Sequence, residues 1–485
     1  MSNTLYDFGM IGLGTMGSNL LLNMADNHFA VIGFDINRVK AEEFEASANP
    51  GTIVKGVFEL PLMIQQLKKP RKIMMLVPAG KPVDDVINNL IPLLQKEDII
   101  IDGGNSHYTD TLRRIYFLQE KGIHFMGAGI SGGEMGARTG PSIMPGGDET
   151  AWRQVKSIFE AVSAKVNGEP CVAYMGKWAA GHYVKMVHNG IEYAVMQLIS
   201  EVYDILKRGA GFNNNELHDV FQKWDEGELQ SFLLEITADI FKQPDADTGN
   251  MLVDMILDKA GAKGTGKWTS QNAMDLAVPI PTIDAAVAMR DISVYKNERI
   301  TAAKLYKPVI KKLNADKKTF IQQLHDAFYF ATVICYAQGF ALLQKASAEL
   351  KMDIPLPDVV RIWRGGCIIR SALLDIFYSV YKETPDLPAI LLDKKIAQLI
   401  KSKEENLREI IKQATEIKIP IAGFATALSY FDAYCSGQLP TNLIQAQRDY
   451  FGAHMYQRID KEGMFHNEWQ SLPEHAKKEE PEHKP

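Results

Sequence analysis

Cysteine is scarce in this chain of 485 residues, which has only four: Cys171, Cys335, Cys367 and Cys435. They form no Cys-x-x-Cys pair and no Cys/His cluster, which argues against a zinc motif and against a disulfide framework. We therefore expect buried, free thiols in a reducing compartment, which favours the cytoplasm. No signal peptide is expected either, because Met1 to Asp7 is polar and has no basic start.

Basic excess and long apolar runs are also missing. Lys and Arg total 53 against 59 Asp and Glu, and the formal charge of -6 gives no reason to expect nucleic acid or an anionic membrane as a partner. No uninterrupted apolar stretch reaches the ~18 residues of a membrane span. Anionic small molecules remain possible ligands, because a basic pocket can lie inside an acidic protein. The length and the 46% of hydrophobic residues indicate two or three globular domains.

The first 35 residues predict a strand, a glycine turn, a helix and a second strand. Apolar strands at 7–11 and 30–35 flank a helix at 18–25 and the turn Gly12-Leu13-Gly14-Thr15-Met16-Gly17. This is GxGxxG inside a βαβ unit, where the glycines let a dinucleotide diphosphate approach the backbone at a helix N-terminus. Asp35 ends the second strand, as expected for a carboxylate that binds a ribose 2′-hydroxyl. The alternative is a glycine-rich turn in an α/β domain that binds nothing.

Strands and helices continue to alternate over the next hundred residues. Continuous apolar strands at 72–77, 98–102 and 123–127 are separated by predicted helices at 83–94 and 110–121. Ligands bind where loops leave the carboxyl ends of such strands. Three segments are expected there: Val77-Pro78-Ala79, Gly103-Gly104-Asn105 and Gly129-Ile130-Ser131-Gly132-Gly133. The domain closes with the segment 142–147, a helix near 151–162 and the segment 171–176. Residues 1–178 are thus predicted to form a Rossmann-type, doubly wound α/β domain.

Helical periodicity dominates after residue 178. We predict an all-helical domain over 179–436 and a C-terminal tail over 437–485, of which 474–485 is expected to be disordered. The helical domain opens with a proline-free run from 179 to 208. On it, five polar residues recur at i, i+3, i+4, i+7 and i+8 and share one helix face: Lys185, His188, Asn189, Glu192 and Tyr193. A face so rich in acids, bases and donors indicates a ligand. The alternative is a solvated face with i,i+4 pairs.

Several longer motifs resemble the decarboxylating 6-phosphogluconate dehydrogenase family. Besides the glycine turn and the segments ending in Asn105 and Gly133, they lie in that family's order from the first strand to about Trp469. They are Gly140-Pro-Ser-Ile-Met-Pro-Gly-Gly147, Gly181-His-Tyr-Val-Lys-Met-Val-His-Asn-Gly-Ile-Glu192, Asn250-Met-Leu-Val-Asp254, Lys263-Gly-Thr-Gly-Lys-Trp-Thr269, Gly365-Gly-Cys-Ile-Ile-Arg370 and Leu443-Ile-Gln-Ala-Gln-Arg-Asp-Tyr-Phe-Gly-Ala-His454.

The resemblance implies oxidative decarboxylation of 6-phosphogluconate to ribulose 5-phosphate and CO2. Lys185 would be the base that takes the C3 hydroxyl proton, and it must be neutral, so burial and nearby positive charge should lower its pKa. Protonated Lys185, with Asn189, would then polarise the carbonyl of the β-keto acid. Glu192 would be the acid that protonates C1 of the enediol. No metal is required by this chemistry, and no ligand set for one is evident.

The resemblance also implies a substrate site assembled from distant segments. Asn105, which also adjoins the cofactor, would contact the sugar acid together with Ser131, Gly132, Gly133, His188 and Asn189. The phosphate would be bound by Tyr193, Lys263, Thr265, Arg290 and Arg448, with a further contact from His454. In the family, the tail that carries the last two comes from the partner subunit, which implies an obligate homodimer with composite sites. Any one of these Arg and Lys residues, taken alone, would be interpreted as a surface charge, but their place inside the motifs favours phosphate binding.

Two departures from the family pattern concern the cofactor. NADP is the family's usual cofactor, and its users commonly end the second strand in Asn-Arg-Ser/Thr, where the Arg holds the 2′-phosphate. Here the letters are Asp35-Ile36-Asn37-Arg38, and the carboxylate predicts a preference for NAD by repelling a 2′-phosphate, although Arg38 can still reach one. The other departure is Val77-Pro78-Ala79, where the family often has a Lys. Pro78 removes one backbone N–H from a loop that faces the cofactor.

Two other functions fit parts of the sequence. A β-hydroxyacid dehydrogenase of the related, shorter kind shares GxGxxG, a Ser-Gly-Gly segment and a catalytic Lys. A phosphate-free substrate, however, has no use for Lys263 to Thr269, Arg290 or the tail from Arg448 to His454. A dehydrogenase fold kept only for binding is the non-enzyme alternative. The intact set of Lys185, Glu192 and Asn105 argues against it.

Overall fold

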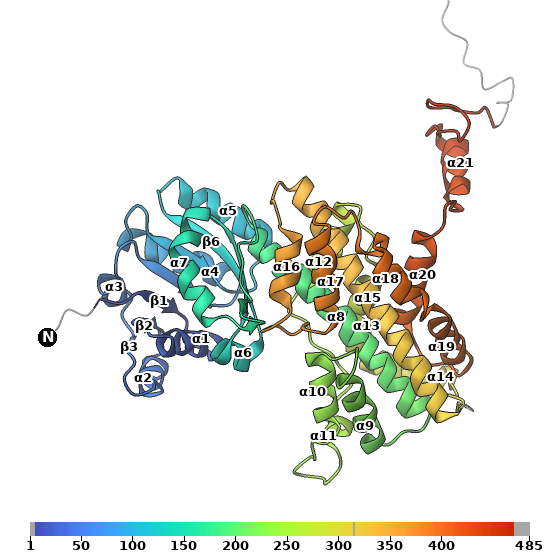
Figure 1. The fold of residues 1–485 in the computed structure, drawn as a ribbon, viewed down its shortest axis with the longest axis horizontal. Coiled ribbons are helices and arrows are strands. Elements are labelled where there is room, and N and C mark those ends of the chain that lie inside the picture. Colours follow the sequence, from blue (N-terminus) through green and yellow to red (C-terminus); the bar gives the residue numbers. More distant parts are fainter. Residues whose placement is uncertain (1–4, 314–315, 470–485) are drawn as a thin grey trace, which may run out of the picture. The chain divides into compact units, whose positions relative to one another are not determined.

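The computed structural model describes residues 5–313 and 316–469 (Figure 1). The chain divides into two compact units between Leu428 and Ser429. The first unit holds both a sheet with its helices and a large set of further helices. The predicted domain borders at 178 and 436 are not tested by this division and stay predictions. The segment 474–485, for which we predict disorder, lies outside the described residues.

A seven-stranded sheet in the order β3-β2-β1-β4-β5-β6-β7 confirms the predicted doubly wound α/β fold. Six strands are parallel, and β7 closes the edge antiparallel to β6, with Ser131 opposite Ser142. The direction of winding reverses between β1 and β4, which puts the ligand-binding crevice at their carboxyl ends. The strands are β1 (Phe8–Ile11), β2 (Val31–Phe34), β3 (Val54–Val57), β4 (Lys72–Met75), β5 (Ile99–Asp102), β6 (His124–Ser131) and β7 (Ser142–Gly147).

Helices cover both faces of this sheet and form a separate apolar core on each. Helices α1, α2, α6 and α7 supply one core, and α3, α4 and α5 supply the other. Strand residues alternate between the two cores, as strands buried on both faces require. These helices are α1 (Thr15–Asp26), α2 (Arg38–Ala46), α3 (Leu60–Gln65), α4 (Lys81–Leu90), α5 (Tyr108–Gln119), α6 (Gly133–Thr139) and α7 (Glu149–Val162).

Two details of this half differ from the sequence-based expectation. The strand β3 was not predicted, because Val54-Lys-Gly-Val57 is short and carries a Lys and a Gly where a buried strand is usually apolar. Residues 129–131, expected in a loop, belong to β6. Pairing with β7 extends that strand, so the loop begins only at Gly132.

The helical part of the first unit is built around α8 (Ala180–Asp204), which confirms the predicted long helix at 179–208 and continues as a π-helix over Ile205–Gly209. Helices α12, α13 and α15 pack along α8. The remaining elements are α9 (Asn214–Asp225), α10 (Phe232–Ile240), α11 (Leu252–Met255), α12 (Thr265–Asp275), α13 (Pro281–Val294), α14 (Lys296–Tyr306), α15 (Lys317–Glu349), α16 (Leu356–Trp363), α17 (Leu373–Glu383), α18 (Lys394–Lys401) and α19 (Glu404–Glu416).

The start of α8 packs directly on the strands β6 and β7 because glycines remove the side chains between them. A Cβ on Gly181 would lie 2.2 Å from the carbonyl oxygen of Gly127. A Cβ on Gly129 would lie 2.4 Å from the Cβ of Lys185. Both separations are too short for real atoms, so this contact between helix and sheet requires glycine at both positions.

One described helix, α15, is long and apolar enough to cross a membrane by length and composition alone. Its most apolar 18-residue window is 94% buried inside the protein, which is the pattern of a core helix. The second unit contains the end of α20 (Ala422–Tyr434), then α21 (Thr441–Gly452) and an irregular segment. There Asp449 accepts hydrogen bonds from the Met455 and Asn467 backbones and from His466 and Trp469.

Candidate functional site

The glycine turn after β1 has the shape that a dinucleotide diphosphate needs. Gly12 has φ +94°, and a Cβ there would lie 2.5 Å from the carbonyl oxygen of Leu76. A Cβ on Gly17 would lie 2.0 Å from the carbonyl oxygen of Gly12, which explains the close contact of helix α1 with the turn. A Cβ on Gly14 would meet nothing within 4 Å. Gly14 therefore borders open space at the N-terminus of α1, where a diphosphate would be stabilised.

The end of β2 presents a carboxylate beside this turn. Asp35 is 9% exposed, and its Oδ2 accepts a hydrogen bond from the Leu13 backbone at 2.9 Å while its Oδ1 accepts one from Asn37 at 2.9 Å. Ile36 is 89% exposed. The Arg38 guanidinium donates to Glu42 at 2.7 Å and lies 4.8 Å from the centre of the Phe58 ring. The Asp35 carboxylate is thus fixed in place, and the Arg38 guanidinium contacts Glu42 and Phe58.

The other predicted cofactor residues follow β4 and β5 at the same edge of the sheet. Val77 is half-buried, and Pro78 and Ala79 are exposed. Asn105 is exposed in the loop after β5, with no hydrogen bond from its side chain recorded within the described part of the chain. Thr15 is exposed at the start of α1, Met16 is half-buried and Leu13 packs into the core. Parallel strands β1, β4 and β5 are neighbours, so these loops lie side by side at their carboxyl ends.

The five-residue polar face of α8 is mostly buried, so its interpretation as a solvated face is wrong. Lys185 is 7% exposed, and His188 is fully buried. The Glu192 side chain is 21% exposed, and Tyr193 is 7% exposed. Ionisable groups are rarely buried without a function or a partner. This face is therefore the best candidate for a catalytic surface within the described residues.

Burial moves the two principal groups on this face in opposite directions. Burial lowers the pKa of the Lys185 amine, while the nearby Glu192 carboxylate and the Cys367 thiol raise it by smaller amounts. Burial raises the pKa of the Glu192 carboxyl, while Lys185 and Arg290 lower it by smaller amounts. A neutral amine and a protonated carboxyl are both favoured, as a base and an acid require. Burial as the cause was predicted, but the predicted contribution of a neighbouring positive charge to Lys185 is wrong.

His188 and Asn189 connect α8 to the other predicted substrate residues. His188 Nε2 lies 3.3 Å from the Ser131 hydroxyl at the end of β6, and Nδ1 lies 3.0 Å from Asn189 Oδ1. Asn189 donates to the Thr265 hydroxyl at 3.2 Å. Burial and the nearby Lys185 keep the pKa of His188 well below its usual range, so the imidazole is neutral. Gly132 and Gly133 follow Ser131 with φ +114° and +63°, which turns the chain into α6.

Tyr193 and Arg290 form the next part of the site. The Arg290 guanidinium lies 3.6 Å from the centre of the Tyr193 ring and donates to the Gly261 carbonyl at 3.4 Å. Lys263 is exposed in the same segment as Gly261. Two cations and a phenol near the far end of the polar face would suit a phosphate. Thr265, predicted for the phosphate, accepts a hydrogen bond from Asn189, and its role in phosphate binding stays a prediction.

The remaining two predicted residues lie in the second unit. Arg448 is exposed on α21 and donates to Gln445 at 3.1 Å. His454 follows that helix and lies against the Phe451 ring, with the two ring centres 5.9 Å apart. Asp449, next to Arg448, holds the segment after α21 through its four hydrogen bonds. The described part of the tail, 437–469, is therefore a structured element in which Arg448 faces solvent.

Trp363 and Cys367 lie near the catalytic face but were not predicted as site residues, because they belong to another segment and show no polar helical spacing. The Trp363 ring lies edge-on to His188, with ring centres 5.5 Å apart. Cys367 donates to the Trp363 carbonyl at 3.0 Å, and its burial raises its pKa to about 12. His182 precedes Lys185 by three positions and shares its helix face, so the same periodicity identifies it. Three cysteines are buried as predicted, but Cys435 is exposed, which corrects that expectation.

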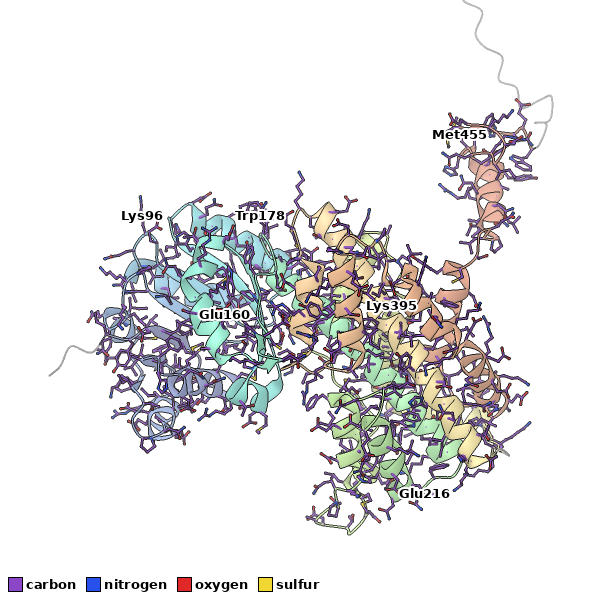
Figure 2. All side chains as sticks on the ribbon, in the orientation of Figure 1. Lys96, Glu160, Trp178, Glu216, Lys395 and Met455 are labelled. Carbon is purple, nitrogen blue, oxygen red and sulfur yellow. The ribbon has the colours of Figure 1, made fainter. Side chains whose placement is uncertain are left out.

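Two other features of the first unit contain none of the predicted site residues. A cavity of about 390 Å³ is lined by residues that include His124 and Trp178 and lies away from the carboxyl ends of the strands. Trp178 is labelled in Figure 2. Glu228, His325 and Asp326 bring three possible metal ligands together among the described residues. The Lys403 ammonium bonds Glu228 at 2.7 Å and Asp326 at 3.1 Å, so a cation of the chain already pairs with both carboxylates. The expected absence of a metal stays a prediction.

Comparison with known proteins matches almost the whole described chain to one family. Residues 7–176 match the model of the NAD binding domain of 6-phosphogluconate dehydrogenase, and residues 181–469 match the model of the C-terminal domain of that enzyme. The NADP(+)-dependent, decarboxylating 6-phosphogluconate dehydrogenase of Bacillus subtilis is 50% identical, with 95% of this chain and 98% of that protein covered. Decarboxylating 6-phosphogluconate dehydrogenase 1 of Saccharomyces cerevisiae is also 50% identical, with 93% and 92% covered.

A solved structure extends this match to three dimensions. The 6-phosphogluconate dehydrogenase of Plasmodium falciparum superposes with a TM-score of 0.92 at 45% identity, covering 96% of this chain and all of that chain. That protein was solved in its apo form and in complexes with NADP+ and with 6-phosphogluconate. The family predicted from the motifs is thus confirmed by sequence and by fold. The chain belongs to the 6-phosphogluconate dehydrogenase family.

Proposed function

We propose that this chain oxidises and decarboxylates 6-phosphogluconate to ribulose 5-phosphate and CO2, with reduction of a nicotinamide dinucleotide. The observation that carries the proposal is the buried face of α8, on which burial lowers the pKa of Lys185 and raises that of Glu192. The identity to decarboxylating relatives over nearly their full length supports it. The cofactor itself, as a class, follows from the matched binding domain.

Each residue has a distinct task in this reaction. Neutral Lys185 takes the proton of the C3 hydroxyl, and the nicotinamide ring, when bound, supplies the hydride acceptor. The resulting ammonium of Lys185, with the amide of Asn189, polarises the C3 carbonyl while the C1 carboxylate leaves as CO2. Lys185 returns its proton to the enolate oxygen left at C3, which gives the enediol. Glu192 then protonates the carbon that lost the carboxylate, C2 of the substrate and C1 of the product, while Lys185 takes the enediol hydroxyl proton and the carbonyl of ribulose 5-phosphate forms. Neutral His188 and Ser131 orient the sugar acid, and Arg290 with Lys263 binds the phosphate.

Initial-rate assays with 6-phosphogluconate and each cofactor test the proposal directly. We expect equimolar CO2 and reduced cofactor, because decarboxylation follows each hydride transfer. Phosphate-free 3-hydroxyacids should be turned over at least about a hundredfold less efficiently, since the phosphate contacts are lost. Efficient oxidation of such acids without CO2 would instead identify a β-hydroxyacid dehydrogenase. Cofactor binding without any reduction would support the non-enzyme alternative.

We further propose that the preferred cofactor is NAD. The Asp35 carboxylate is fixed by two backbone donors beside the glycine turn, and an exposed Ile36 stands where NADP users of the family commonly have Arg. A 2′-phosphate placed there would meet a negative charge, whereas a 2′-hydroxyl can donate to it. Arg38 is held by Glu42 and Phe58. The B. subtilis relative is named NADP(+)-dependent, so this preference would distinguish the two proteins.

Two variants, each compared with wild type, separate the contributions to this preference. Wild type should show a kcat/KM for NAD at least about tenfold above that for NADP, equivalent to about 1.4 kcal/mol. Asp35→Asn combined with Ile36→Arg should reverse the ratio, because it removes the repulsion and adds a phosphate ligand. Glu42→Gln, which frees Arg38 from its carboxylate partner, should move the ratio towards NADP by less than the double variant does, because Asp35 still repels a 2′-phosphate. A wild type that favours NADP would refute the proposal.

We also propose a homodimer in which each tail completes the partner's site. Large apolar side chains are exposed on the first unit around α11, α13 and α14, and on α21 of the second unit, which favours burial against another surface. They are Ile256, Leu257, Ile292, Tyr295, Leu305, Tyr306, Leu443, Ile444 and Phe451. Arg448 and His454 are carried by the same tail as the last three. A location in the cytoplasm, favoured by the free cysteines, remains a prediction.

Complementation between inactive subunits tests the composite site. Lys185→Met and Arg448→Ala should each be nearly inactive alone. Mixed by unfolding and refolding together, they should regain activity, because a hybrid dimer has one site with Lys185 from one subunit and Arg448 from the other. Refolding each variant separately before mixing is the control. If hybrids form but no activity returns, Arg448 serves the site of its own chain.

A further inference from the structure

A buried arginine joins two of the loops at the carboxyl edge of the sheet. Arg114 lies on α5, and its side chain is 1% exposed. Its Nη2 donates to the carbonyl oxygen of Gly80, directly after the loop 77–79, at 3.0 Å. Its Nη1 donates to the Ser106 hydroxyl, directly after Asn105, at 3.2 Å and approaches Asp102 Oδ2 at 3.5 Å. One guanidinium thus bonds both the loop after β4 and the loop after β5.

The fourth bond fixes the guanidinium itself. Arg114 Nε donates to Asp84 Oδ1 at 2.8 Å, in the first turn of α4, so the plane of the guanidinium cannot rotate. The N–H groups of Arg114 thus reach oxygen atoms of Gly80 and Ser106 in the two loops, of Asp102 at the end of β5 and of Asp84 on α4. A lysine would retain the charge but would reach only part of this set, because its ammonium is a single point rather than a fork.

Asp102 carries the constraint to Asn105. Its Oδ1 accepts a hydrogen bond from Gly104 at 3.0 Å, and its Oδ2 accepts one from the Ser106 hydroxyl at 2.6 Å. These two bonds bracket Asn105 on both sides. Asp102 and Ser106 are buried, while Asn105 is exposed at the loop tip. The loop is therefore shaped from beneath by Asp102 and Arg114.

The same network reaches the catalytic helix. His182 on α8 lies 3.0 Å from the Asp102 carbonyl oxygen through Nε2 and 2.6 Å from the Thr111 hydroxyl through Nδ1. A carbonyl only accepts, so Nε2 carries the proton and Nδ1 accepts from Thr111. Burial lowers the pKa of His182, which agrees with this neutral tautomer. His182 lies one helical turn before Lys185, so the loop of Asn105 and the base are connected through two hydrogen bonds and one turn.

We propose that Arg114 is a positioning residue: it sets the loops 77–80 and 103–106 relative to each other and to Lys185, and thereby places Asn105 between cofactor and substrate. The expected effect on kcat, through Asn105, rests on the proposed function, whereas the expected effect on cofactor affinity does not. A misplacement of about 1 Å at a reacting centre can reduce the rate about a hundredfold. Loss of Arg114 should therefore reduce both the catalytic rate and the affinity for cofactor, although Arg114 itself contacts neither substrate nor cofactor.

The neighbouring arginine supplies a matched control. Arg113 also bonds Asp84, at 2.9 and 3.0 Å, but it is 56% exposed and no bond from it to either loop is recorded among the described residues. We expect Arg114→Lys to lower kcat about 10- to 100-fold and to weaken binding of the reduced cofactor, measured by its fluorescence, at least about fivefold. Arg113→Lys should change both by less than twofold. Ser106→Ala, which removes one hydroxyl that accepts from Arg114 and donates to Asp102 but leaves the guanidinium and its other bonds, should fall between them.

Two further measurements separate positioning from a loss of folded protein. Guanidinium ion should restore activity to Arg114→Ala at least about fivefold, and should not affect Arg113→Ala. In an Asn105→Ala background, Arg114→Lys should lose much of its effect on kcat, because the residue acts through that loop. If Arg114→Lys is folded and keeps kcat and cofactor affinity within twofold of wild type, or if its loss multiplies fully with that of Asn105→Ala, the proposal is overturned. A wild type that binds cofactor but does not turn over 6-phosphogluconate would defeat the proposed function alone, because the cofactor-affinity comparison still decides the role of Arg114.

Discussion

The cofactor edge of the sheet and the polar face of α8 recognise their ligands by different means. At the glycine turn, the groups available to a dinucleotide are backbone N–H groups, an open space beside Gly14 and one carboxylate, Asp35. On α8, the groups are side chains, and burial changes the pKa of Lys185, His188 and Glu192. The cofactor edge therefore depends on the conformation of a short segment. The polar face of α8 depends on the distant segments that bury its ionisable side chains.

This difference implies different sensitivities to mutation. A backbone site fails when a side chain enters its space. A site built from buried ionisable groups fails when one group is removed, and its activity depends on pH. The contact between the regions is a glycine surface, because Gly129 on β6 and Gly181 on α8 leave no room for a Cβ. Each variant in the next three paragraphs affects one region and should leave the other measurable.

Lys185→Met should have the largest effect, because it removes the base of the hydride step. We expect kcat to fall at least about a thousandfold, at the upper part of the range for general base catalysis. The affinity for cofactor, measured by fluorescence titration, should change less than about twofold, since the glycine turn is untouched. Asn189→Asp, on the same helix face, is the comparison for a change that keeps the base. If Lys185→Met retained a kcat near wild type, its assignment as base would be wrong.

Glu192→Gln should reduce kcat about a hundredfold and change the pH profile. Wild-type kcat/KM should depend on two ionisations, because activity needs Lys185 without its proton and Glu192 with its own. The ionisation of Lys185 should lie below the usual range of a lysine, and that of Glu192 above the usual range of a carboxyl, since burial lowers one pKa and raises the other. The variant should lose only the ionisation of Glu192. An unchanged profile would assign the acid to another group.

Alanine at two glycines of the turn should separate cofactor binding from folding. Gly14→Ala places its Cβ in open space, so the melting temperature should stay within about 1 °C of wild type, while cofactor affinity should fall about tenfold or more. Gly17→Ala places its Cβ 2.0 Å from the Gly12 carbonyl oxygen, so the fold itself should be destabilised by about 1–3 kcal/mol. Calorimetry measures the stability of each variant, and fluorescence titration measures its affinity for cofactor. Equal effects of the two variants on stability would contradict the described turn.

The division between the two regions also explains what the sequence predicted well. The glycine turn and the strands β1, β2, β4 and β5 are local patterns, and the structure confirms them. The polar face of α8 was visible as a spacing, but its burial was not, because the covering residues come from β6, α12 and α16. The network of Arg114, Asp102 and His182 has no local pattern at all: its members are separated by up to 80 positions and meet only in the fold. The NAD preference and the role of the tail remain predictions.

The smallest expected effect lies at the other end of α8, away from both regions, and concerns stability. Glu201 is 3% exposed and accepts hydrogen bonds from the backbones of Gly423 and Phe424 at the start of α20. Burial raises the pKa of its carboxyl from 4.5 to about 7, against the opposing effect of its hydrogen-bond donors. A pKa raised on folding means that the folded state holds the proton more tightly than the unfolded state. The stability it contributes is therefore complete below pH 4.5 and is lost as the pH rises through about 7. The shift corresponds to about 3 kcal/mol, or a few °C for a chain of this size.

Between pH 6 and 8.5, the melting temperature of wild type should fall more than that of Glu201→Gln, which cannot ionise. Glu349→Gln, an exposed residue of α15, is the matched control and should follow wild type. Parallel curves for wild type and Glu201→Gln would show that the carboxyl ionises alike in the folded and unfolded chain.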